Sequence, residues 1–442
     1  MPELVWKGKG GKGGAARSSA ALRTDEVYGA PAAPWHNRLV LGDTLRALPA
    51  LLAGGPGLPG LAGQVALVYV DPPFDTGGAF DYRVAIPGAP DGAPRIRARA
   101  YSDARGLDAW LGWFYATAAL LRELLADGGS LYVHLDAHAA HYAKVVLDEV
   151  FGASAFQREI IWRIGWVSGF KSRARGWIRN HDTLLFYAKG GTPTTFHKQY
   201  IPYPPGYVRR DGAAPKAAGY PVDDVWNGSE IDRMDSIQIM SFSGEKNGYP
   251  TQKNEALVAR VVRASSNPGD LVLDCCAGSG TTAAVAEKLS RRWIACDGGA
   301  LAVHATRKRL LAPGREAPFV VQSVARARSA GRPRKLSVRA VVTGRRATLD
   351  LRAFALPPAD VPAEARAGIE HWSQWIEGWC VDWDHRGGPL QAGARSWRPR
   401  SGRPLPLEVS HVYPRPGRYV ALVKVFDLLG GATTKKVRVE VA

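Results

Sequence analysis

Apolar residues in the first 190 positions form short continuous runs separated by longer stretches with helical spacing. The short runs predict buried strands at residues 37–41, 65–70, 130–136, 159–164 and 183–189. The stretches between them predict helices at residues 44–53, 107–129 and 138–152. Strands that alternate with helices at this spacing predict an α/β fold with a doubly wound, mostly parallel sheet. One Gly-, Pro- and Arg-rich segment, residues 86–103, is expected to be a loop.

The pattern changes several times along the rest of the chain. Periodicity is poor after residue 190 and returns with a helix at 254–266 and a strand–loop–helix–strand unit at 271–297. Near the C-terminus, period-two alternation around turns predicts an all-β sandwich. We therefore expect a flexible basic arm over 1–34, an α/β domain over 35–312 with an insertion at about 191–247, a basic linker over 313–335 and a β-sandwich over 336–442.

Charge and cysteine content narrow the class of protein. The chain has 58 Lys and Arg against 40 Asp and Glu, a formal net charge of +18, which favours a polyanionic partner and nucleic acid in particular. Its four cysteines form neither a disulfide framework nor a Cys/His cluster, so no zinc site or other metal is expected. Without an apolar run of membrane-spanning length or a signal-peptide pattern, we expect a cytoplasmic protein that binds no membrane.

The segment "LVLDCCAGSGTT" has the features of a ligand-binding loop. A strand ends at Asp274, small residues follow, and a helix opens at Thr281. Small residues let the backbone approach a ligand, and the helix N-terminus offers free N–H groups. The next strand ends at Asp297, where an acid in such a unit can hold the ribose hydroxyls of a nucleoside cofactor. A tight turn with a capping Asp is the alternative explanation.

The segment "VALVYVDPPF" ends a strand with residues that cannot extend it. Pro72 and Pro73 stop the ladder, so Asp71 and Phe74 face the crevice at the carboxyl end of the sheet. A carboxylate and the Pro72 carbonyl are two acceptors beside an aromatic face. This set suits an aromatic amine that lies flat on Phe74 and donates its two N–H bonds. Such acceptors favour a pyramidal nitrogen whose lone pair turns toward an electrophile.

Together these segments resemble the S-adenosylmethionine-dependent DNA amino-methyltransferases. Asp71, Pro72, Pro73 and Phe74 match the family's catalytic motif, and "LDCCAGSGTT" is similar to its cofactor loop. The catalytic motif comes first, as in the circularly permuted β class, which implies a Rossmann-like methyltransferase fold. "NRLVLGD", "NGYPTQKN" and "HDTLLFYAK" resemble further motifs in the same order. The resemblance assigns S-adenosylmethionine to a set of residues contributed by these motifs: Asp43, Thr251, Lys253, Asp274, Cys276, Ala277, Gly278, Ser279, Gly280, Thr281, Thr282 and Asp297.

The chain departs from the family pattern at a few positions. Cys275 and Cys276 replace the usual Pro-Phe, and Asn254 replaces a proline. We expect the two thiols to be buried space-filling residues, with reactive thiols as the alternative. Because Asp at the first motif position is commoner among adenine enzymes, the expected target is N6 of a flipped-out adenine. Cytosine N4, structured RNA and a non-catalytic DNA-binding role remain alternatives.

Double-stranded DNA is the expected substrate, and basic residues interleaved with rings are candidates for holding it. The candidates are Lys171, Arg173, Arg175, Arg179, Arg209 and Arg210. The family resemblance also leaves a homodimer and a restriction partner open. The C-terminal run that contains Tyr413, Pro414, Gly417 and Tyr419 resembles a PKD-like β-sandwich.

Overall fold

The computed structural model describes most of the chain. The described residues are 3–10, 21–29, 35–55, 58–90, 95–164, 175–214, 217–227, 245–312, 318–324, 334–362, 365, 368–399 and 404–442.

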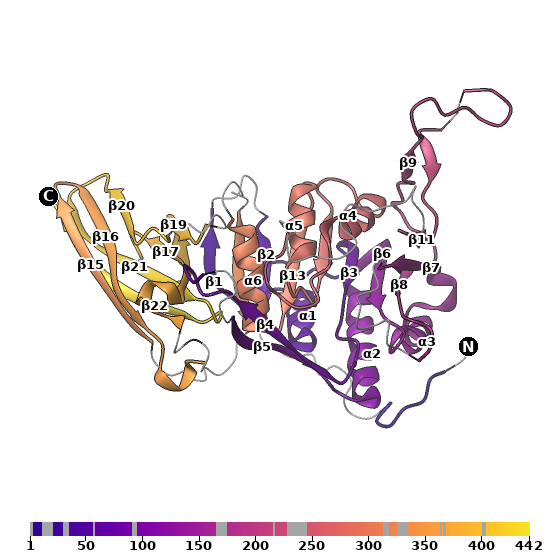
Figure 1. The fold of residues 1–442 in the computed structure, drawn as a ribbon, viewed down its shortest axis with the longest axis horizontal. Helices are drawn as coiled ribbons and strands as arrows, with labels where there is room; N and C mark the ends of the chain where they lie inside the picture. The colour runs from indigo at the N-terminus through magenta and orange to yellow at the C-terminus, as the bar shows by residue number, and fades with distance from the viewer. Residues whose placement is uncertain are drawn as a thin grey trace.

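An 11-stranded sheet runs through the molecule in the order β11-β7-β8-β6-β3-β12-β13-β2-β14-β1-β18 (Figure 1). Its central strands, from β6 to β14, are all parallel to their neighbours, and antiparallel pairs occur only toward the two edges. The strands are β1 Leu22–Tyr28, β2 Asn37–Leu41, β3 Val65–Val70, β6 Leu125–Leu135, β7 Phe156–Arg163, β8 His181–Ala188, β11 Val225–Trp226, β12 Leu271–Asp274, β13 Arg292–Asp297, β14 Phe319–Val324 and β18 Leu390–Ala392.

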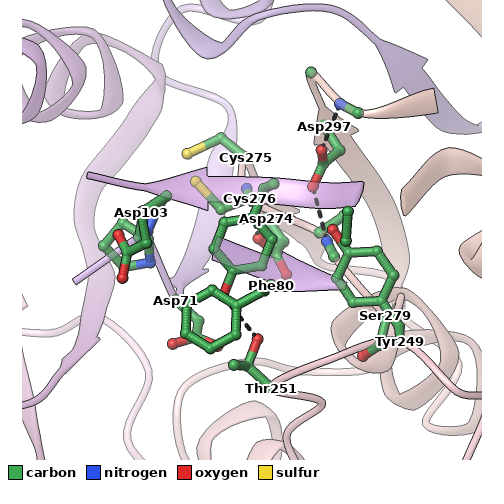
Figure 2. Close-up of a pocket in the computed structure, with 18 of the residues that line it drawn as sticks. Asp71, Phe80, Asp103, Tyr249, Thr251, Asp274, Cys275, Cys276, Ser279 and Asp297 are labelled. Atoms are coloured by element: carbon green, nitrogen blue, oxygen red, sulfur yellow. Dashed lines mark hydrogen bonds between the residues drawn. The ribbon is translucent and has the colours of Figure 1, made fainter. Parts of the chain in front are cut away.

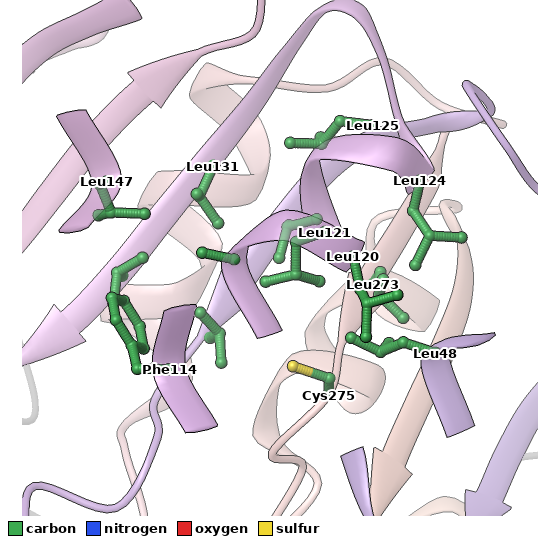
Figure 3. Packing of buried hydrophobic residues seen from close by; sticks show 14 of the residues in the cluster. Leu48, Phe114, Leu120, Leu121, Leu124, Leu125, Leu131, Leu147, Leu273 and Cys275 are labelled. Atoms are coloured by element: carbon green, nitrogen blue, oxygen red, sulfur yellow. The ribbon is translucent and has the colours of Figure 1, made fainter. Parts of the chain in front are cut away.

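Helices cover both faces of this sheet, as a doubly wound fold requires. Side chains of α1, α2 and α3 share one hydrophobic cluster with the sheet, and side chains of α4, α5 and α6 share another (Figure 3). Within β3, Val68 and Val70 face the first cluster whereas Leu67 and Tyr69 face the second. The helices are α1 Thr44–Ala53, α2 Leu107–Leu124, α3 Ala140–Phe151, α4 Glu255–Ala264, α5 Thr281–Lys288 and α6 Ala300–Leu310, with short 3₁₀ turns at Ala153–Ala155, Pro358–Asp360 and Trp372–Trp375 (η4). The expected fold class is confirmed.

Two segments differ from the expected arm and linker. Residues 22–28 of the expected arm form β1, and residues 319–324 of the expected linker form β14, which pairs with β1 antiparallel and with β2 in parallel. Both segments therefore extend the central sheet rather than connect domains. The buried Glu26 explains why β1 escapes a hydrophobicity pattern, because a charged side chain occupies an inward position.

The segment expected to be a loop after the DPPF turn is instead half of a β-hairpin. β4 (Gly78–Val84) and β5 (Ile96–Asp103) pair antiparallel from Gly78–Asp103 to Val84–Ile96. β5 is built on period-two alternation, with Ile96 buried and Arg97 exposed. We refer to residues 78–90 and 95–103 as the β4–β5 hairpin.

The insertion at 191–247 is partly built from short strands. β9 (Tyr200–Pro202) pairs with β10 (Gly219–Pro221), and β11 joins the edge of the main sheet next to β7. Figure 1 shows the segment around β9 extending away from the sheet. On this segment the rings of Tyr203 and Tyr207 stack, and the ring of Tyr220 meets both of them edge-on; we call these three rings the tyrosine stack.

Residues 334–442, here called the C-terminal β domain, form the expected β-sandwich. It combines a three-stranded sheet, β15-β16-β20, with a four-stranded sheet, β19-β17-β21-β22. The turn entering β21 is fixed by Tyr413, whose hydroxyl donates to the Trp383 carbonyl at 2.8 Å and whose ring stacks on Tyr419. The strands are β15 Lys335–Thr343, β16 Arg346–Ala355, β17 Ile376–Asp382, β19 Ala394–Trp397, β20 Glu408–Val412, β21 Gly417–Asp427 and β22 Ala432–Val441.

The C-terminal β domain is joined to the main sheet by strand pairing and buried charges. Its β18 pairs in parallel with β1. The carboxylate of Glu26 on β1 receives Lys424 Nζ of β21 at 2.6 Å and Arg307 Nε of α6 at 3.0 Å. Burial opposes ionisation, but Arg307 and Lys424 lower the pKa of Glu26 to about 2. A charged cluster of this kind, paired on three elements, fixes how they sit together.

Candidate active site

A pocket of about 430 Å³ lies at the carboxyl ends of β3, β12 and β13, and we call it the central pocket (Figure 2). Ligand crevices in open α/β sheets occupy this position. The DPPF turn (residues 71–74) and the loop between β12 and α5 (residues 275–280, here called the glycine loop) line the same cavity. The two segments are about two hundred residues apart in the chain. Nearly all of the residues that the motif resemblance assigned line it as well: Asp43, Asp71, Pro72, Pro73, Phe74, Thr251, Lys253, Asp274, Cys276, Ala277, Gly278, Ser279, Thr281, Thr282 and Asp297.

The DPPF turn is held from behind by aromatic residues. The Pro73 carbonyl accepts a hydrogen bond from Trp110 Nε1 at 2.6 Å. The Phe74 ring stacks on His134, with ring centroids 6.4 Å apart and planes 20° apart. His134 is itself fixed by Tyr69 and Asp182, at 2.9 and 3.2 Å. Phe74 therefore packs against the His134 ring, whose orientation is fixed by two hydrogen bonds.

The carboxylate of Asp71 is paired with Lys253. Lys253 Nζ lies 2.8 and 2.7 Å from its two oxygens, and 5.1 Å from the centroid of the Phe74 ring. The sequence motif grouped Lys253 with the residues around the cofactor. In the structure the Lys253 carbonyl accepts from the Thr281 hydroxyl at 2.9 Å, whereas its ammonium contacts the DPPF turn.

The glycine loop follows β12 and needs glycine at two positions. Gly278 has φ of 48° and Gly280 has φ of 75°, in the left-handed region. A Cβ on Gly280 would also lie 2.7–2.9 Å from Thr306 of α6. Gly280, which does not line the cavity, therefore acts on the loop by letting it approach α6.

Five carboxylates line the pocket, those of Asp43, Asp71, Asp103, Asp274 and Asp297, and the pKa values of Asp274 and Asp297 are raised. Burial raises the pKa of Asp274 to about 7, the charges of Asp71 and Asp297 add to the rise, and hydrogen bonds from Thr282 and the Cys276 N–H oppose it. Burial also raises the pKa of Asp297. The N–H groups of Gly299 and Gly278, which donate to its carboxylate at 2.7 and 2.9 Å, oppose this rise. The crowding of acids makes this pocket suited to a ligand that carries positive charge.

The opposite wall comes from the β4–β5 hairpin and from the segment before α4. Phe80, Tyr101 and Asp103 of the hairpin line the pocket, as does Tyr249 (Figure 2). The Tyr101 hydroxyl lies 3.0 Å from Thr251 Oγ1. Sequence reasoning missed all four of these wall residues as site residues. Tyr249 lies inside "NGYPTQKN" and could have been found there, whereas the hairpin residues carry no motif.

Two residues of the motif segments also cap helices. Asn254, which replaces the usual proline, caps α4 by accepting from the Leu257 N–H at 2.7 Å. Asp43 caps α1 through the Leu45 N–H at 3.0 Å and also borders the pocket. Neither arrangement removes a group from the cavity.

The adjacent cysteines are packed rather than exposed. Cys275 is buried against Leu48 and Leu273, as Figure 3 shows, and Cys276 lies partly buried at the pocket. The neighbouring Cys275 thiol and burial hold the pKa of Cys276 well above its usual value. A protonated thiol is a poor nucleophile, so the reactive alternative is not supported.

The candidate DNA-contacting residues are only partly described. Lys171 and Arg173 lie outside the described residues. Arg179 pairs with Asp136 and, at 3.2 Å, with Asp182 beneath the DPPF turn. Arg209 pairs with Asp211 at 2.9 Å on the segment between β9 and β10. Arg175, Arg179 and Arg210 are exposed.

Comparisons with known proteins found a matching family and several similar chains. Residues 65–308, just over half of the chain, match the DNA methylase family N6_N4_Mtase. The chain is 26% identical over 341 residues to the type II methyltransferase M.EcaI of Enterobacter cloacae, covering 62% of this chain and 69% of that protein. It is 26% identical over 251 residues to the DNA adenine methyltransferase YhdJ of Escherichia coli, covering 53% and 71%. The cytosine-N4-specific PvuII DNA methyltransferase structure is 18% identical, with 63% and 88% covered and a TM-score of 0.40.

A separate similarity covers the C-terminal part. The PKD1 domain of the Vibrio cholerae metalloprotease PrtV matches 24% of this chain over 93% of its own length, at 14% identity and a TM-score of 0.16. Among the described residues, no helix is long and apolar enough to cross a membrane. The DPPF turn, the glycine loop and the match over residues 65–308 lead to one conclusion: the chain belongs to the N6/N4 DNA methylase family.

Proposed function

We propose that the protein transfers a methyl group from S-adenosylmethionine to the N6 amine of an adenine that is flipped out of duplex DNA. The observation that carries this proposal is that Asp71 of the DPPF turn and the glycine loop line one cavity. An amine-orienting acid and a nucleoside-binding loop must share a cavity if a methyl group is to pass directly between their ligands. Adenine is preferred to cytosine because Asp stands first in the catalytic motif and because YhdJ, a relative, is named an adenine enzyme.

The cofactor occupies the part of the central pocket around the glycine loop. Asp297 holds the ribose hydroxyls and Asp43 borders the adenine, while Asp274 and the loop from Cys276 to Thr282 hold the rest of the cofactor, including Ala277, Gly278, Ser279 and Thr281. The carboxylates that line the pocket support this arrangement, because S-adenosylmethionine carries an ammonium and a sulfonium.

Asp71 and the Pro72 carbonyl accept the two N–H bonds of the target amine, and Phe74 stacks on the base. Aiming the hydrogens at these acceptors turns the nitrogen lone pair toward the methyl carbon. A nitrogen–carbon bond forms as the carbon–sulfur bond breaks, and the sulfur keeps the electron pair. S-adenosylhomocysteine leaves, and the cationic nitrogen gives its extra proton to the Asp71 carboxylate, which releases it to solvent.

Lys253 forms an ion pair with the Asp71 carboxylate, which is the group that would accept the target amine. Its ammonium contacts both carboxylate oxygens and lies over the ring on which the base would stack. An incoming adenine must therefore displace Lys253 from at least one oxygen. The Asp71 carboxylate thus has a hydrogen-bond donor both before the base arrives, from Lys253, and after it, from the target amine.

In this proposal DNA is held by two segments, residues 175–180 and the insertion at about 191–247. Trp177 is fully exposed next to Arg175, which suits a ring that stacks against a base and a cation that pairs with phosphate. Arg209 and Arg210 lie on the extended segment between β9 and β10, beside the tyrosine stack. A surface with cations and rings on both segments can hold a distorted duplex.

The test is transfer of labelled methyl from S-adenosylmethionine to unmethylated duplex DNA, followed by nucleoside mass spectrometry. We expect N6-methyladenine from the wild type and none from Asp71→Asn, which should still bind S-adenosylhomocysteine and DNA. Asp384→Asn, an exposed acid of the C-terminal β domain, is the matched control and should keep full activity. N4-methylcytosine would keep the site and change the base, and labelled RNA alone would change the substrate. A cofactor-bound protein that methylates no nucleic acid would overturn the proposal.

A further inference from the structure

The β4–β5 hairpin connects the central pocket to the C-terminal β domain. Figure 1 shows the two strands running from the region of α2 toward the end of the molecule that holds β17 and β22. One end of the hairpin forms a wall of the pocket, and the other end is buried in the C-terminal β domain. The two ends therefore lie in different parts of the protein.

The pocket end of the hairpin is tied to both halves of the site. Asp103 is buried, and its carboxylate accepts from the Asp75 N–H at 2.8 Å and from the Thr76 hydroxyl at 2.7 Å. These contacts set the turn that follows Phe74. On the same strand, the Tyr101 hydroxyl reaches Thr251 at 3.0 Å. A shift of β5 would therefore move the pocket wall and the turn after the DPPF motif together.

The far end of the hairpin shares a hydrophobic cluster with the C-terminal β domain. Ile86 and Ile96 are buried in one cluster with Trp375 and Trp379 of that domain and with Leu301 of α6. The contact is close: a Cβ on Gly368 would lie 2.5 Å from Ile86 Cδ1. Glycine at 368 thus lets the domain press directly against the hairpin.

One directed hydrogen bond adds to this packing. Gln374 Nε2, on η4, donates to the Pro87 carbonyl at 2.7 Å. The orientation of the amide is set by its other atom, because Gln374 Oε1 accepts from the backbone N–H groups of Glu370 and His371, both at 2.8 Å. Only the NH₂ end can then face the hairpin.

We propose that the C-terminal β domain acts as a clamp that holds the β4–β5 hairpin in position and so sets the affinity of the central pocket for S-adenosylmethionine. The inference rests on the proposed function, since it names what the pocket binds. Gln374 and Gly368 are positioning residues, because they act on the pocket through the hairpin.

A physical argument supports the need for a clamp. A two-stranded hairpin is marginally stable on its own in water and needs a packing partner. The described hairpin strands pair only with each other and join neither edge of the 11-stranded sheet. The partner at the far end is the C-terminal β domain, which is itself fixed to α6 by the Lys308–Glu377 pair at 2.7 Å. α6 also contacts the glycine loop, through the Thr306 hydroxyl and the Gly278 carbonyl. The same helix therefore supports the loop directly and the hairpin through the C-terminal β domain.

The first experiment uses Gln374→Glu in the full-length protein, with S-adenosylhomocysteine as the ligand in calorimetry. A glutamate keeps an oxygen for the Glu370 and His371 N–H groups, but it places a second acceptor against the Pro87 carbonyl. We expect the Kd to rise about fivefold or more, which corresponds to losing one hydrogen bond. The affinity for duplex DNA and the melting temperature of the ligand-free protein should stay near wild type.

The matched control is Gln391→Glu, which adds the same charge to an exposed position of the same domain. It should leave the Kd for S-adenosylhomocysteine unchanged. A second readout is amide hydrogen exchange of β5, which should speed up in Gln374→Glu and not in Gln391→Glu. A purely structural role for Gln374 would change the melting temperature without this selective loosening.

The second experiment uses a compensating pair at the packed contact. Gly368→Ala adds a methyl group that collides with Ile86 Cδ1, and it should weaken cofactor binding by displacing the hairpin. Ile86→Val removes that Cδ1, so the double variant Gly368→Ala/Ile86→Val should recover affinity relative to Gly368→Ala alone. Recovery would show that the two residues act through one contact.

The outcomes separate this inference from the proposed function. If the wild type binds S-adenosylhomocysteine and both Gln374→Glu and Gly368→Ala bind it equally well, the clamp is refuted and the proposed function stands. If Gln391→Glu weakens binding as much as Gln374→Glu, the effect is general charge and the clamp is refuted. A wild type that binds no S-adenosylhomocysteine would overturn both proposals.

Discussion

The raised pKa of Asp274 makes cofactor binding depend on pH in the neutral range. With its pKa at about 7, Asp274 is largely protonated at pH 6 in the ligand-free protein. A cofactor that carries an ammonium and a sulfonium favours the ionised form, so binding must release a proton below pH 7. Affinity should therefore rise as the pH rises through 7.

The size of the effect follows from the pKa. If only ionised Asp274 binds, the apparent Kd scales as one plus the ratio of protonated to ionised carboxyl groups. For a pKa of about 7, the Kd for S-adenosylmethionine falls about eightfold between pH 6 and pH 7.5. The cofactor amine titrates near pH 8, so the range ends below it.

Calorimetry at four pH values between 6 and 7.5 measures this dependence, and Asp274→Asn is the control. The amide cannot ionise, so its binding should be weaker at pH 7.5 and nearly independent of pH. The same variant should be more stable than the wild type without ligand, because a carboxyl with a raised folded pKa loses its stabilising contribution as the pH rises from about 4 through 7. A wild-type Kd that stays constant from pH 6 to 7.5 would refute the assignment of Asp274 to the cationic ligand.

Three further substitutions test other parts of the structure. Glu26→Gln should cost about 3–5 kcal/mol in denaturant unfolding, because Arg307 and Lys424 would keep buried charges without a partner; in the wild type this contribution should be lost only as the pH falls from 4.5 toward 2. Gly280→Ala should abolish the thermal shift with S-adenosylhomocysteine, because alanine at φ of 75° is strained and its methyl would lie 2.7 Å from a side chain of α6. Trp177→Ala should weaken duplex binding about tenfold in a mobility-shift assay, as loss of one stacked ring predicts, and leave cofactor affinity unchanged.

The order of strands and helices in the catalytic part could be predicted from periodicity, and the site could be predicted from motifs. Asp71 and Asp274 each end an apolar parallel strand, and parallel strands bring their carboxyl ends to one edge. That rule alone places the DPPF turn beside the glycine loop. The pairing of Lys253 with Asp71 has no comparable signal, because it depends on how the segment before α4 folds over the pocket.

The strands that the sequence analysis missed, β1 and β5, have amino-acid compositions that are not typical of strands. Residues 86–103 contain enough Gly, Pro and Arg to indicate a loop, yet residues 96–101 alternate and form β5. Its arginines occupy the exposed positions, so a charge-rich strand was interpreted as an irregular segment. β1 was missed for the opposite reason: Glu26 faces inward, where its charge is balanced by Arg307 and Lys424, which are distant in the sequence. Partners this far along the chain cannot be identified from local pattern.

The distribution of charge connects the two substrates. The protein as a whole is strongly positive, at +18, whereas the central pocket is surrounded by Asp71, Asp274 and Asp297. A polyanion is attracted by the overall field and a small cation by the local one, so duplex DNA and S-adenosylmethionine are drawn to different surfaces. Lys253 is paired with Asp71, the acid that is proposed to accept the target amine. In the proposed reaction, the neutral amine of the base therefore replaces an ammonium at Asp71.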